Sequence, residues 1–354
     1  MNISILSSFK VIRKTFLGVD IGTSSLKIVE LSSLGEKTTL KNYGELQASL
    51  LYDKPFRSFE KNALLLSSRD ISRAIRAILE EAKILTKSAV FSIPDFSSFF
   101  TNFDLPPMSK EELPNAIQFE ARKQIPVPIS EVTFDWQLAG GKFDPKKTSR
   151  ILLVAVPNDV ISQYQEMARL ARLNLSALEV EVFGFMRAAL RGNTSLSIIL
   201  VDIGAQTTAL AVVRNGILGR SQSIDVGGNN LTQQMSKSLT IEYKAAEEEK
   251  HRTGIVASSE SKRILAPFLD MIIEEIRRIS LGGKDASEIQ KIVIGGGSAR
   301  LPGLKEYFQK HIGKKVEIID PFKDIFYPPI LEKTLQKVGP SYAVAIGAAL
   351  RGLE

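Results

Sequence analysis

The chain has 354 residues, of which 44% are hydrophobic and 24% charged, and its formal net charge is +7. This length corresponds to about two domains with room for a small insertion, and the composition is that of a globular protein, which excludes a disordered or collagen-like chain. The absence of cysteine excludes disulfides and thiolate metal sites, and two histidines leave little scope for histidine-rich metal sites or Ser/His/Asp triads.

The excess of positive charge is mild and spread along the chain. It fits a soluble cytoplasmic protein or a surface near nucleic acid or anionic lipid, but no basic block interleaved with aromatic residues favours nucleic acid. No apolar run approaches the roughly 20 residues that cross a bilayer. Between Met1 and Thr15 the charges follow the apolar residues, the reverse of a signal peptide. These residues either form a short amphipathic helix or lead into the first strand. Because neither a membrane span nor a signal peptide is indicated, we expect a cytoplasmic protein whose membrane contact is indirect.

A repeated pattern organises the chain. An apolar strand, an Asp-Ile-Gly turn, small hydroxyl residues and a second β-rich stretch occur at 16–31 and again at 199–213. Each copy predicts a hairpin, and each continues into further strand, at 38–46 and 216–226.

The two turns have the residues of an anion site. Gly22 and Gly204 let the backbone approach a ligand closely, and the amides and hydroxyls beside them can surround an anion. Asp20 and Asp202 end the preceding strands, where each would hold Mg²⁺ through water or position an attacking water. Two such hairpins facing each other would form a clamp.

Residues 89–175 have a different character. Strands are predicted at 89–93, 99–103, 132–138 and 151–156, and helices at 110–123 and 159–173. Ser109 and Glu112 have capping-box spacing at the start of the first helix, and Pro126 and Pro128 end it. We interpret this stretch as a small α+β insertion that serves binding rather than chemistry.

The second half of the chain predicts helices at 231–249 and 264–279 and a strand from 291 that ends in three glycines. A helix with Pro302 in its first turn is expected to follow. The glycine turn at 295–297 either lets a flat base or a phosphate lie against main chain, or is only a strand-to-helix turn.

In this order the motifs resemble the actin-like ATPase superfamily, which includes sugar kinases, heat-shock chaperones and the division protein FtsA. The resemblance implies an α/β, two-lobed, actin-like (ribonuclease H-like) fold with ATP and Mg²⁺ between the lobes and connecting helices at 179–190 and 341–350. The nucleotide-binding residues that it implies are Asp20, Gly22, Thr23, Ser24, Ser25, Lys27, Asp202, Gly204, Gln206, Thr207, Thr208, Gly228, Glu247, Lys250, Gly295, Gly296, Gly297 and Ser298. Asp20 and Asp202 are the candidate magnesium ligands, and Glu181 is the candidate for orienting the attacking water.

Longer stretches resemble the PilM family of type IV pilus assembly proteins along nearly the whole chain. They lie at 16–31, 105–113, 116–122, 124–126, 227–232 and 340–352. The resemblance implies that the insertion replaces an actin lobe. It departs from the family at Val182, where proline is usual, and at Gln206, which adds bulk to the second loop; both bear on the rate of hydrolysis.

The PilM resemblance also implies a partner. The cytoplasmic N-terminal peptide of PilN, an inner-membrane protein, would dock in a groove between the insertion and the main lobe. Ile125, Val127, Phe134 and Trp136 are candidate groove walls, or else they form the core of the insertion. Other pilus assembly proteins and self-association are further expected contacts, and nucleic acid is not.

These inferences predict four subdomains. They are a first lobe (1–88 with 176–195 and 340–354), the insertion (89–175), a second lobe (196–226 with 291–339) and a smaller subdomain (227–290). The predicted function is a cytoplasmic ATP-binding scaffold, with slow ATPase activity at most, peripheral to the inner membrane in a type IV pilus, competence or secretion machine. The alternatives are a small-molecule kinase of the same superfamily and an FtsA-like division scaffold.

Overall fold

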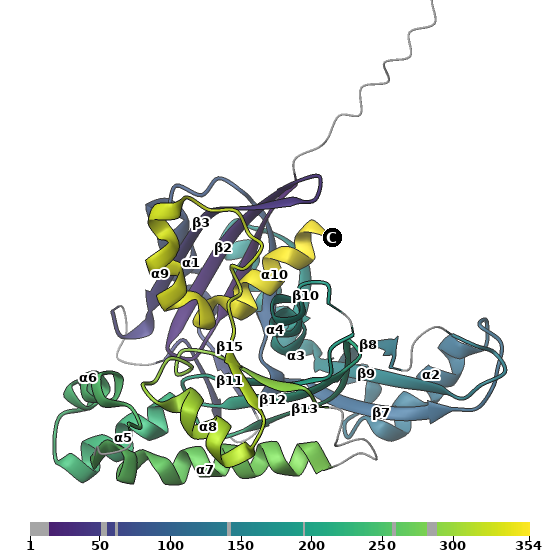
Figure 1. The fold of residues 1–354 in the computed structure, drawn as a ribbon. Coiled ribbons are helices and arrows are strands. Elements are labelled where there is room, and N and C mark those ends of the chain that lie inside the picture. Colours follow the sequence, from purple (N-terminus) through teal and green to yellow (C-terminus); the bar gives the residue numbers. More distant parts are fainter. Residues whose placement is uncertain are drawn as a thin grey trace, which may run out of the picture.

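The computed structural model describes residues 14–50, 55–60, 63–139, 143–193, 195–256, 260–281 and 289–354 (Figure 1). The apolar stretch before Lys14, for which a short amphipathic helix was one expectation, lies outside these ranges.

Two five-stranded sheets form the centre of the molecule. When the strands of each sheet are numbered along the chain, both sheets have the same spatial order. The first is ordered β10-β6-β1-β2-β3 and the second β15-β14-β11-β12-β13. In each, the first three strands in sequence are antiparallel and the other two run parallel to the first. The strands of the first sheet are β1 (Lys14–Ile21), β2 (Ser25–Leu34), β3 (Lys37–Gln47), β6 (Ser88–Ile93) and β10 (Asn174–Val180). Those of the second are β11 (Ile198–Ile203), β12 (Thr208–Arg214), β13 (Ile217–Ile224), β14 (Lys291–Gly295) and β15 (Lys315–Ile318).

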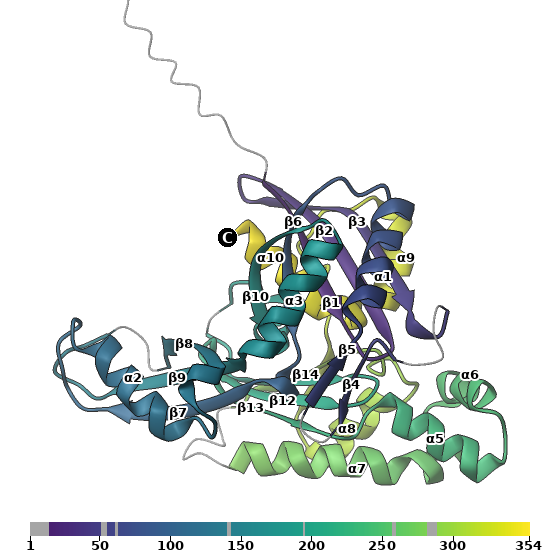
Figure 2. The same ribbon diagram turned by 180° about the vertical axis from the view of Figure 1, so that it is seen from behind.

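Helices cover both faces of the first sheet, which explains why its central strands are buried on both sides. α1 (Ser68–Glu81) and α3 (Asn158–Leu170) lie on one face (Figure 2). α9 (Glu332–Val338) and α10 (Ala343–Leu353) lie on the other (Figure 1). The short strands β4 (Arg57–Glu60) and β5 (Ala63–Leu66) form a separate hairpin.

Glycine allows the last helix to pack closely between its neighbours. A Cβ on Gly18 of β1 would stand 1.9 Å from the Ala345 carbonyl oxygen of α10. A Cβ on Gly347 of α10 would stand 1.9 Å from the carbonyl oxygen of Gly184 in α4 (Glu181–Leu190). Backbone therefore meets backbone on two sides of α10, and no larger residue fits at either glycine.

An arginine ties this junction together. Arg187 of α4 makes two hydrogen bonds of 2.7 Å to Glu179, and also donates to the Gly347 carbonyl (3.0 Å) and to Glu354 (2.9 Å). Burial lowers the pKa of Arg187, but the attraction of its carboxylate partners raises the pKa by more than burial lowers it. The pKa of Arg187 therefore lies above its usual value. Glu179 was expected in the helix but lies in β10, because the strand continues to Val180 beside β6.

The insertion is a three-stranded antiparallel sheet with one helix. The sheet is ordered β7-β9-β8, and its members are β7 (Phe99–Leu105), β8 (Val132–Leu138), β9 (Ser149–Pro157) and α2 (Leu113–Gln124). Ser109 and Glu112 exchange the expected hydrogen bonds, at 2.8 and 3.3 Å, but around a turn that precedes the helix. The helix begins later than predicted because Pro114 is tolerated only in a first turn.

Helices pack beside the second sheet, and those that precede β14 lie in the range expected for the smaller subdomain. The helices are α5 (Gly228–Leu239), α6 (Tyr243–Thr253), α7 (Glu260–Leu281) and α8 (Leu304–Ile312). The single helix predicted at 231–249 is wrong, because Thr240 adopts a left-handed conformation (φ 53°) that ends α5. Pro302 lies before α8 rather than inside it, since Gly303 at φ 79° separates the two. The helix predicted to reach 173 ends at Leu170, and Arg172 at φ 59° turns the chain back.

Two packing arrangements differ from the expected subdomain boundaries. β6 and α3 fall within 89–175 but pack in the first lobe, where β6 lies between β1 and β10. Residues 320–338 fall within the range expected for the second lobe, yet Phe322 and Leu335 pack against Leu31 of the first sheet. None of the helices within the described ranges is both long and apolar enough to cross a membrane.

Candidate functional site

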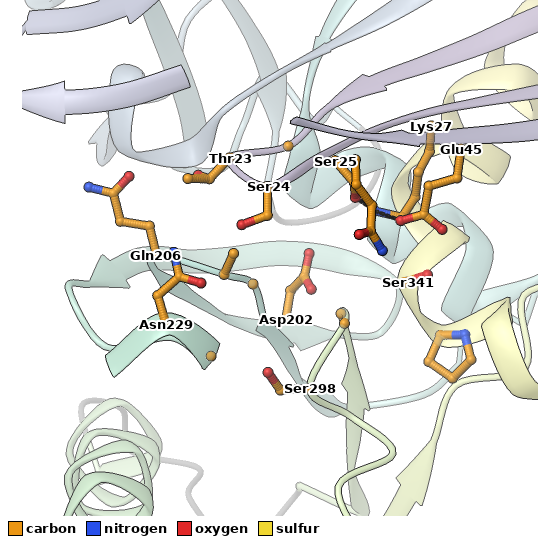
Figure 3. Close-up of a pocket in the computed structure, with 18 of the residues that line it drawn as sticks. Thr23, Ser24, Ser25, Lys27, Glu45, Asp202, Gln206, Asn229, Ser298 and Ser341 are labelled. Atoms are coloured by element: carbon orange, nitrogen blue, oxygen red, sulfur yellow. Dashed lines mark hydrogen bonds and ion pairs between the residues drawn. The ribbon is translucent and has the colours of Figure 1, made fainter. Parts of the chain in front are cut away.

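A cleft of about 1080 Å³ lies between the two lobes. It opens where β1 of the first sheet and β11 and β14 of the second end, and ligands usually bind at the carboxyl ends of such parallel strands. Figure 3 shows Thr23, Ser24 and Ser25 of the first hairpin on one side and Asp202 of the second on the other.

The two hairpin turns have the same geometry. The Gly22 amide donates to the Ser25 carbonyl at 2.9 Å, and the Gly204 amide donates to the Thr207 carbonyl at 3.0 Å. A Cβ on Gly22 or Gly204 would stand 2.8 or 3.0 Å from that same carbonyl oxygen, so both turns are tighter than a larger residue accepts. The repeat predicted from the sequence is therefore a repeat of turn structure as well.

Asp20 and Lys27 face each other across the first hairpin. They are paired in the register of β1 and β2, and both are 8% exposed. Asp20 accepts a hydrogen bond from the Ser92 hydroxyl at 2.9 Å. The Lys27 ammonium donates to Ser25 and lies 3.5 Å from a carboxylate oxygen of Glu45.

Asp202, the penultimate residue of β11, points across the cleft toward the first hairpin (Figure 3). The glycine turn after β14 lies against it, because a Cβ on Gly296 would stand 2.4 Å from its carboxylate oxygen. Gly296 has φ 86° and its amide donates to the Pro340 carbonyl at 2.9 Å, which links this turn to the segment before α10. At Gly297 a Cβ would meet no atom within 4 Å. The cleft wall is therefore bare main chain at that point.

An ion pair between buried Lys250 and half-buried Glu247 lies beside the second hairpin. The Lys250 ammonium, 3% exposed, donates to Glu247 (2.7 Å), Thr232 (2.8 Å) and the Gly228 carbonyl (3.2 Å). The Gly228 amide in turn donates to the Gly204 carbonyl at 2.9 Å. The network therefore joins α6, α5 and the second hairpin.

The pKa values of this pair depend on burial and on their mutual contact. Burial raises the pKa of Glu247, but hydrogen bonds from His251 and the charge of Lys250 outweigh it and lower the pKa to about 2. Burial lowers the pKa of Lys250, and the attraction of Glu247 only partly reverses this. Glu247 is thus an anion at any physiological pH.

Most of the predicted nucleotide, metal and catalytic residues line the cleft. They are Asp20, Gly22, Thr23, Ser24, Ser25, Lys27, Glu181, Asp202, Gly204, Gln206, Thr207, Gly228, Glu247, Lys250, Gly296, Gly297 and Ser298. Thr208 is outside this lining: it is fully buried and its hydroxyl donates to the Val226 carbonyl at 2.6 Å. Gly295 is also outside, because it packs against the Phe185 ring of α4.

Several residues of the lining were not predicted. Glu45 reaches Lys27 from β3, and the register of β2 with β3 is the signal that would have placed it there. Ser341 reaches the cleft from the segment before α10, which the sequence predicted as the start of a connecting helix but not as part of the site. Gln206, expected to add bulk, extends away from Asp202 in Figure 3. Other unpredicted members include Asn229, Tyr243, His251, Arg300, Lys337 and Pro340.

The four candidate partner residues lie in the insertion. Ile125 is buried at 5% exposure in the core of the insertion, and Phe134 and Trp136 are half-buried against the same core. Val127 is 44% exposed. The structure therefore leaves Val127, with the outer parts of the two aromatic rings, accessible to another molecule.

The residues of the cleft fit a nucleotide with magnesium. Mg²⁺ takes oxygen ligands, keeps several waters and is usually held by one or two carboxylates together with phosphate oxygens, which matches Asp20 and Asp202. Within the described residues no cluster of three or more acidic or histidine side chains is arranged as a self-sufficient metal site. The bare main chain at Gly297 and the ammonium of Lys27 suit a flat base and a phosphate respectively.

Comparison with known proteins extends this description. The family model described as type IV pilus assembly protein PilM matches residues 18–353. The cell division protein FtsA of Streptococcus pneumoniae is 21% identical over 349 residues, which covers 86% of this chain and 75% of FtsA. FtsA of Neisseria meningitidis is 29% identical over 141 residues, so that match spans only 32% of this chain and 34% of that protein.

Solved structures resemble the whole chain. A PilM–PilN type IV pilus biogenesis complex superposes with a TM-score of 0.82 at 23% identity, covering 96% of this chain and 98% of the other. MreB5 of Spiroplasma citri, solved bound to AMPPNP, superposes with a TM-score of 0.57 at 13% identity, covering 95% of each chain. The expected α/β actin-like fold is thereby confirmed.

Proposed function

Because the chain belongs to the PilM family of type IV pilus assembly proteins, we propose that it is a nucleotide-binding scaffold of a type IV pilus or a related competence or secretion machine. In this proposal it works in the cytoplasm, at the inner face of the cytoplasmic membrane, and an inner-membrane protein holds it there. The observation that carries the nucleotide part is the pair of matched hairpin turns with Asp20 and Asp202 on opposite sides of one cleft.

ATP with Mg²⁺ is the proposed ligand. The hairpin amides and hydroxyls would surround the phosphates, and the ammonium of Lys27 would neutralise part of their charge. Asp20 and Asp202 would hold the hydrated metal, which when bound spreads the phosphate charge. The glycine turn and the side of α6 that carries Glu247 and Lys250 would contact the nucleoside.

Glu181 is the proposed residue for orienting an attacking water. It is the first residue of α4 and lines the cleft. A carboxylate at that position can accept a hydrogen bond from water near the terminal phosphate, and it contributes by orientation rather than covalent chemistry. We expect hydrolysis to be slow, so that the nucleotide acts mainly by favouring one arrangement of the lobes.

The nucleotide proposal is tested by titrating the purified chain with a fluorescent ATP analogue, with Mg²⁺ and with EDTA. We expect saturable binding that Mg²⁺ strengthens and that unlabelled ATP reverses, and free phosphate serves as the control competitor. Absence of binding under both conditions would contradict the proposal.

The proposed partner is the cytoplasmic N-terminal peptide of a PilN-like inner-membrane protein. Support comes from family membership, from the likeness to the solved PilM–PilN complex and from the apolar, partly exposed side chains of Val127, Phe134 and Trp136. An extended peptide can insert alternate side chains between such residues. Titration with synthetic N-terminal peptides, with and without ATP and against a scrambled sequence, tests this part; equal affinity for the scrambled peptide would refute it.

The likeness to FtsA supports one alternative, a division scaffold. The two functions predict different partners. Affinity capture of a tubulin-like protein by the purified chain, with no binding to pilus peptides, would favour the alternative.

A further inference from the structure

We propose that Ser92, next to the last residue of strand β6, and Asp95, two residues after that strand, are positioning residues of the cleft. Ser92 would set the carboxylate of Asp20 toward the metal, and Asp95 would set the first turn of α4, which carries Glu181. This inference rests on the proposed nucleotide function and names two residues outside the cleft lining on which that function would depend.

Three neighbouring parallel strands bring these residues together. β6 lies between β1 and β10, and all three point their carboxyl ends toward the cleft. Asp20 is the penultimate residue of β1, and β10 leads directly into Glu181 at the start of α4. The end of β6 therefore lies between the two carboxylates to which the metal and the water are assigned.

Ser92 contacts the first of these carboxylates. Its side chain is almost fully buried, at 2% exposure, and its hydroxyl donates to Asp20 at 2.9 Å. A serine hydroxyl can occupy the position at that carboxylate oxygen that water would otherwise take, and so fixes which oxygen remains for a metal.

Asp95 holds the helix that carries the second carboxylate. It is 6% exposed, and its carboxylate accepts a hydrogen bond of 3.1 Å from the backbone amide of Val182. The residue at the usual capping position, Val180, makes no side-chain cap. A carboxylate from elsewhere in the chain thus satisfies one of the first amides of α4, where it also meets the positive end of the helix dipole.

The test compares alanine with conservative variants. Ser92→Thr keeps a hydroxyl, Asp95→Asn keeps an acceptor oxygen, and exposed Asp104 of β7 gives the matched control Asp104→Asn. Circular dichroism and thermal unfolding establish that each variant folds. The conservative variants keep the proposal testable if an alanine variant does not.

For Ser92 the readout is the Mg²⁺ concentration at which affinity for a fluorescent ATP analogue rises. We expect Ser92→Ala to raise that Mg²⁺ concentration about tenfold, because the hydrogen bond to the charged Asp20 carboxylate is lost. The affinity in EDTA should stay unchanged, since that bond acts only through the metal. Ser92→Thr should restore the wild-type value. Equal Mg²⁺ dependence in Ser92→Ala and the Asp104→Asn control would overturn the role of Ser92.

For Asp95 the readout is the split between kcat and KM for ATP turnover. We expect Asp95→Ala to lower kcat about tenfold with little change in KM, since the water-orienting carboxylate moves while the phosphate contacts stay. Asp95→Asn should recover most of kcat. Equal losses of kcat in Asp95→Ala and Asp95→Asn would overturn the role of Asp95. A wild-type chain that binds ATP without turning it over would also overturn it.

These outcomes are separable from failure of the proposed function. A wild-type chain that binds no nucleotide would remove both proposals together. If the wild-type chain binds nucleotide and the variants behave in the same way as the wild type, only the positioning roles are removed.

Discussion

Replacing Gly347 by alanine should strongly destabilise the fold. The Cβ of alanine would stand 1.9 Å from the carbonyl oxygen and 2.3 Å from the carbonyl carbon of Gly184. Ordinary contacts of this kind begin at about 3.4 Å, so α10 and α4 would have to separate by about 1.5 Å. Because the obstacle is backbone, no side-chain rotation relieves it.

The opposite side of α10 limits the alternative of moving the helix. Its Ala345 carbonyl already packs against Gly18 of β1 with no room for a methyl group. Overpacking of this kind typically costs up to about 3 kcal/mol, and a clash with backbone lies at the upper end. That cost exceeds the gain of about 1 kcal/mol that alanine brings to an open helical position. For a chain of this length the fall in melting temperature should be on the order of 3 °C.

Gly184→Ala is the graded comparison, because it lies in the same helix crossing. Its Cβ would stand 3.1 Å from the Val344 carbonyl oxygen, a tight contact that a small shift removes. Urea and thermal unfolding of both variants, followed by circular dichroism, should therefore rank Gly184→Ala near wild type and Gly347→Ala far below it. Equal stability of the two variants would refute the argument from backbone approach.

Three further predictions concern the cleft and the insertion. Replacing Asp20 and Asp202 together by alanine should abolish nucleotide binding while circular dichroism stays unchanged; retained micromolar affinity would count against the assignment. For Glu247, a pKa lowered to about 2 from 4.5 means that its charge stabilises the fold above pH 4.5 and ceases to do so as the pH falls toward 2. Because its side chain is 38% exposed, we expect Glu247→Gln to cost only about 1 kcal/mol at neutral pH and to reduce acid sensitivity, and an unaltered stability curve between pH 2 and 5 would contradict this. Val127→Asp should weaken binding of the partner peptide about tenfold. The surface control Ile330→Ser, 89% exposed, should not, and equal losses would argue against Val127 as a contact.

The sequence predicted the parts of the site that are local. The hairpins at Asp20 and Asp202 were predictable because an apolar strand, a glycine turn and a second strand are neighbours in the chain. The insertion was recognisable for the same reason, because each of its strands β7, β8 and β9 is a short continuous run of strand-forming residues. Their geometry follows from turn chemistry, which a single sequence contains.

Other features depend on contacts between distant segments. The break between α5 and α6 depends on Thr240, a residue other than glycine in the left-handed conformation. Helix propensity does not predict such a residue. Ser341 enters the cleft because the Gly296 amide bonds to the preceding Pro340, a tertiary contact without a sequence pattern. Phe322 packs on the first lobe instead of the second because the chain crosses back before α9. Such placements are decided by packing rather than by periodicity.

The two halves of the duplicated fold differ in how soon each can be completed during synthesis. The core beside the second sheet draws on residues between Ile199 and Val316, a continuous stretch of chain. The first sheet must wait for α10, as shown by the Lys14 ammonium that donates to the Leu353 carbonyl 339 positions later. During synthesis the core beside the second sheet could therefore be completed before α10 reaches the first sheet, and the cleft between the lobes would form last.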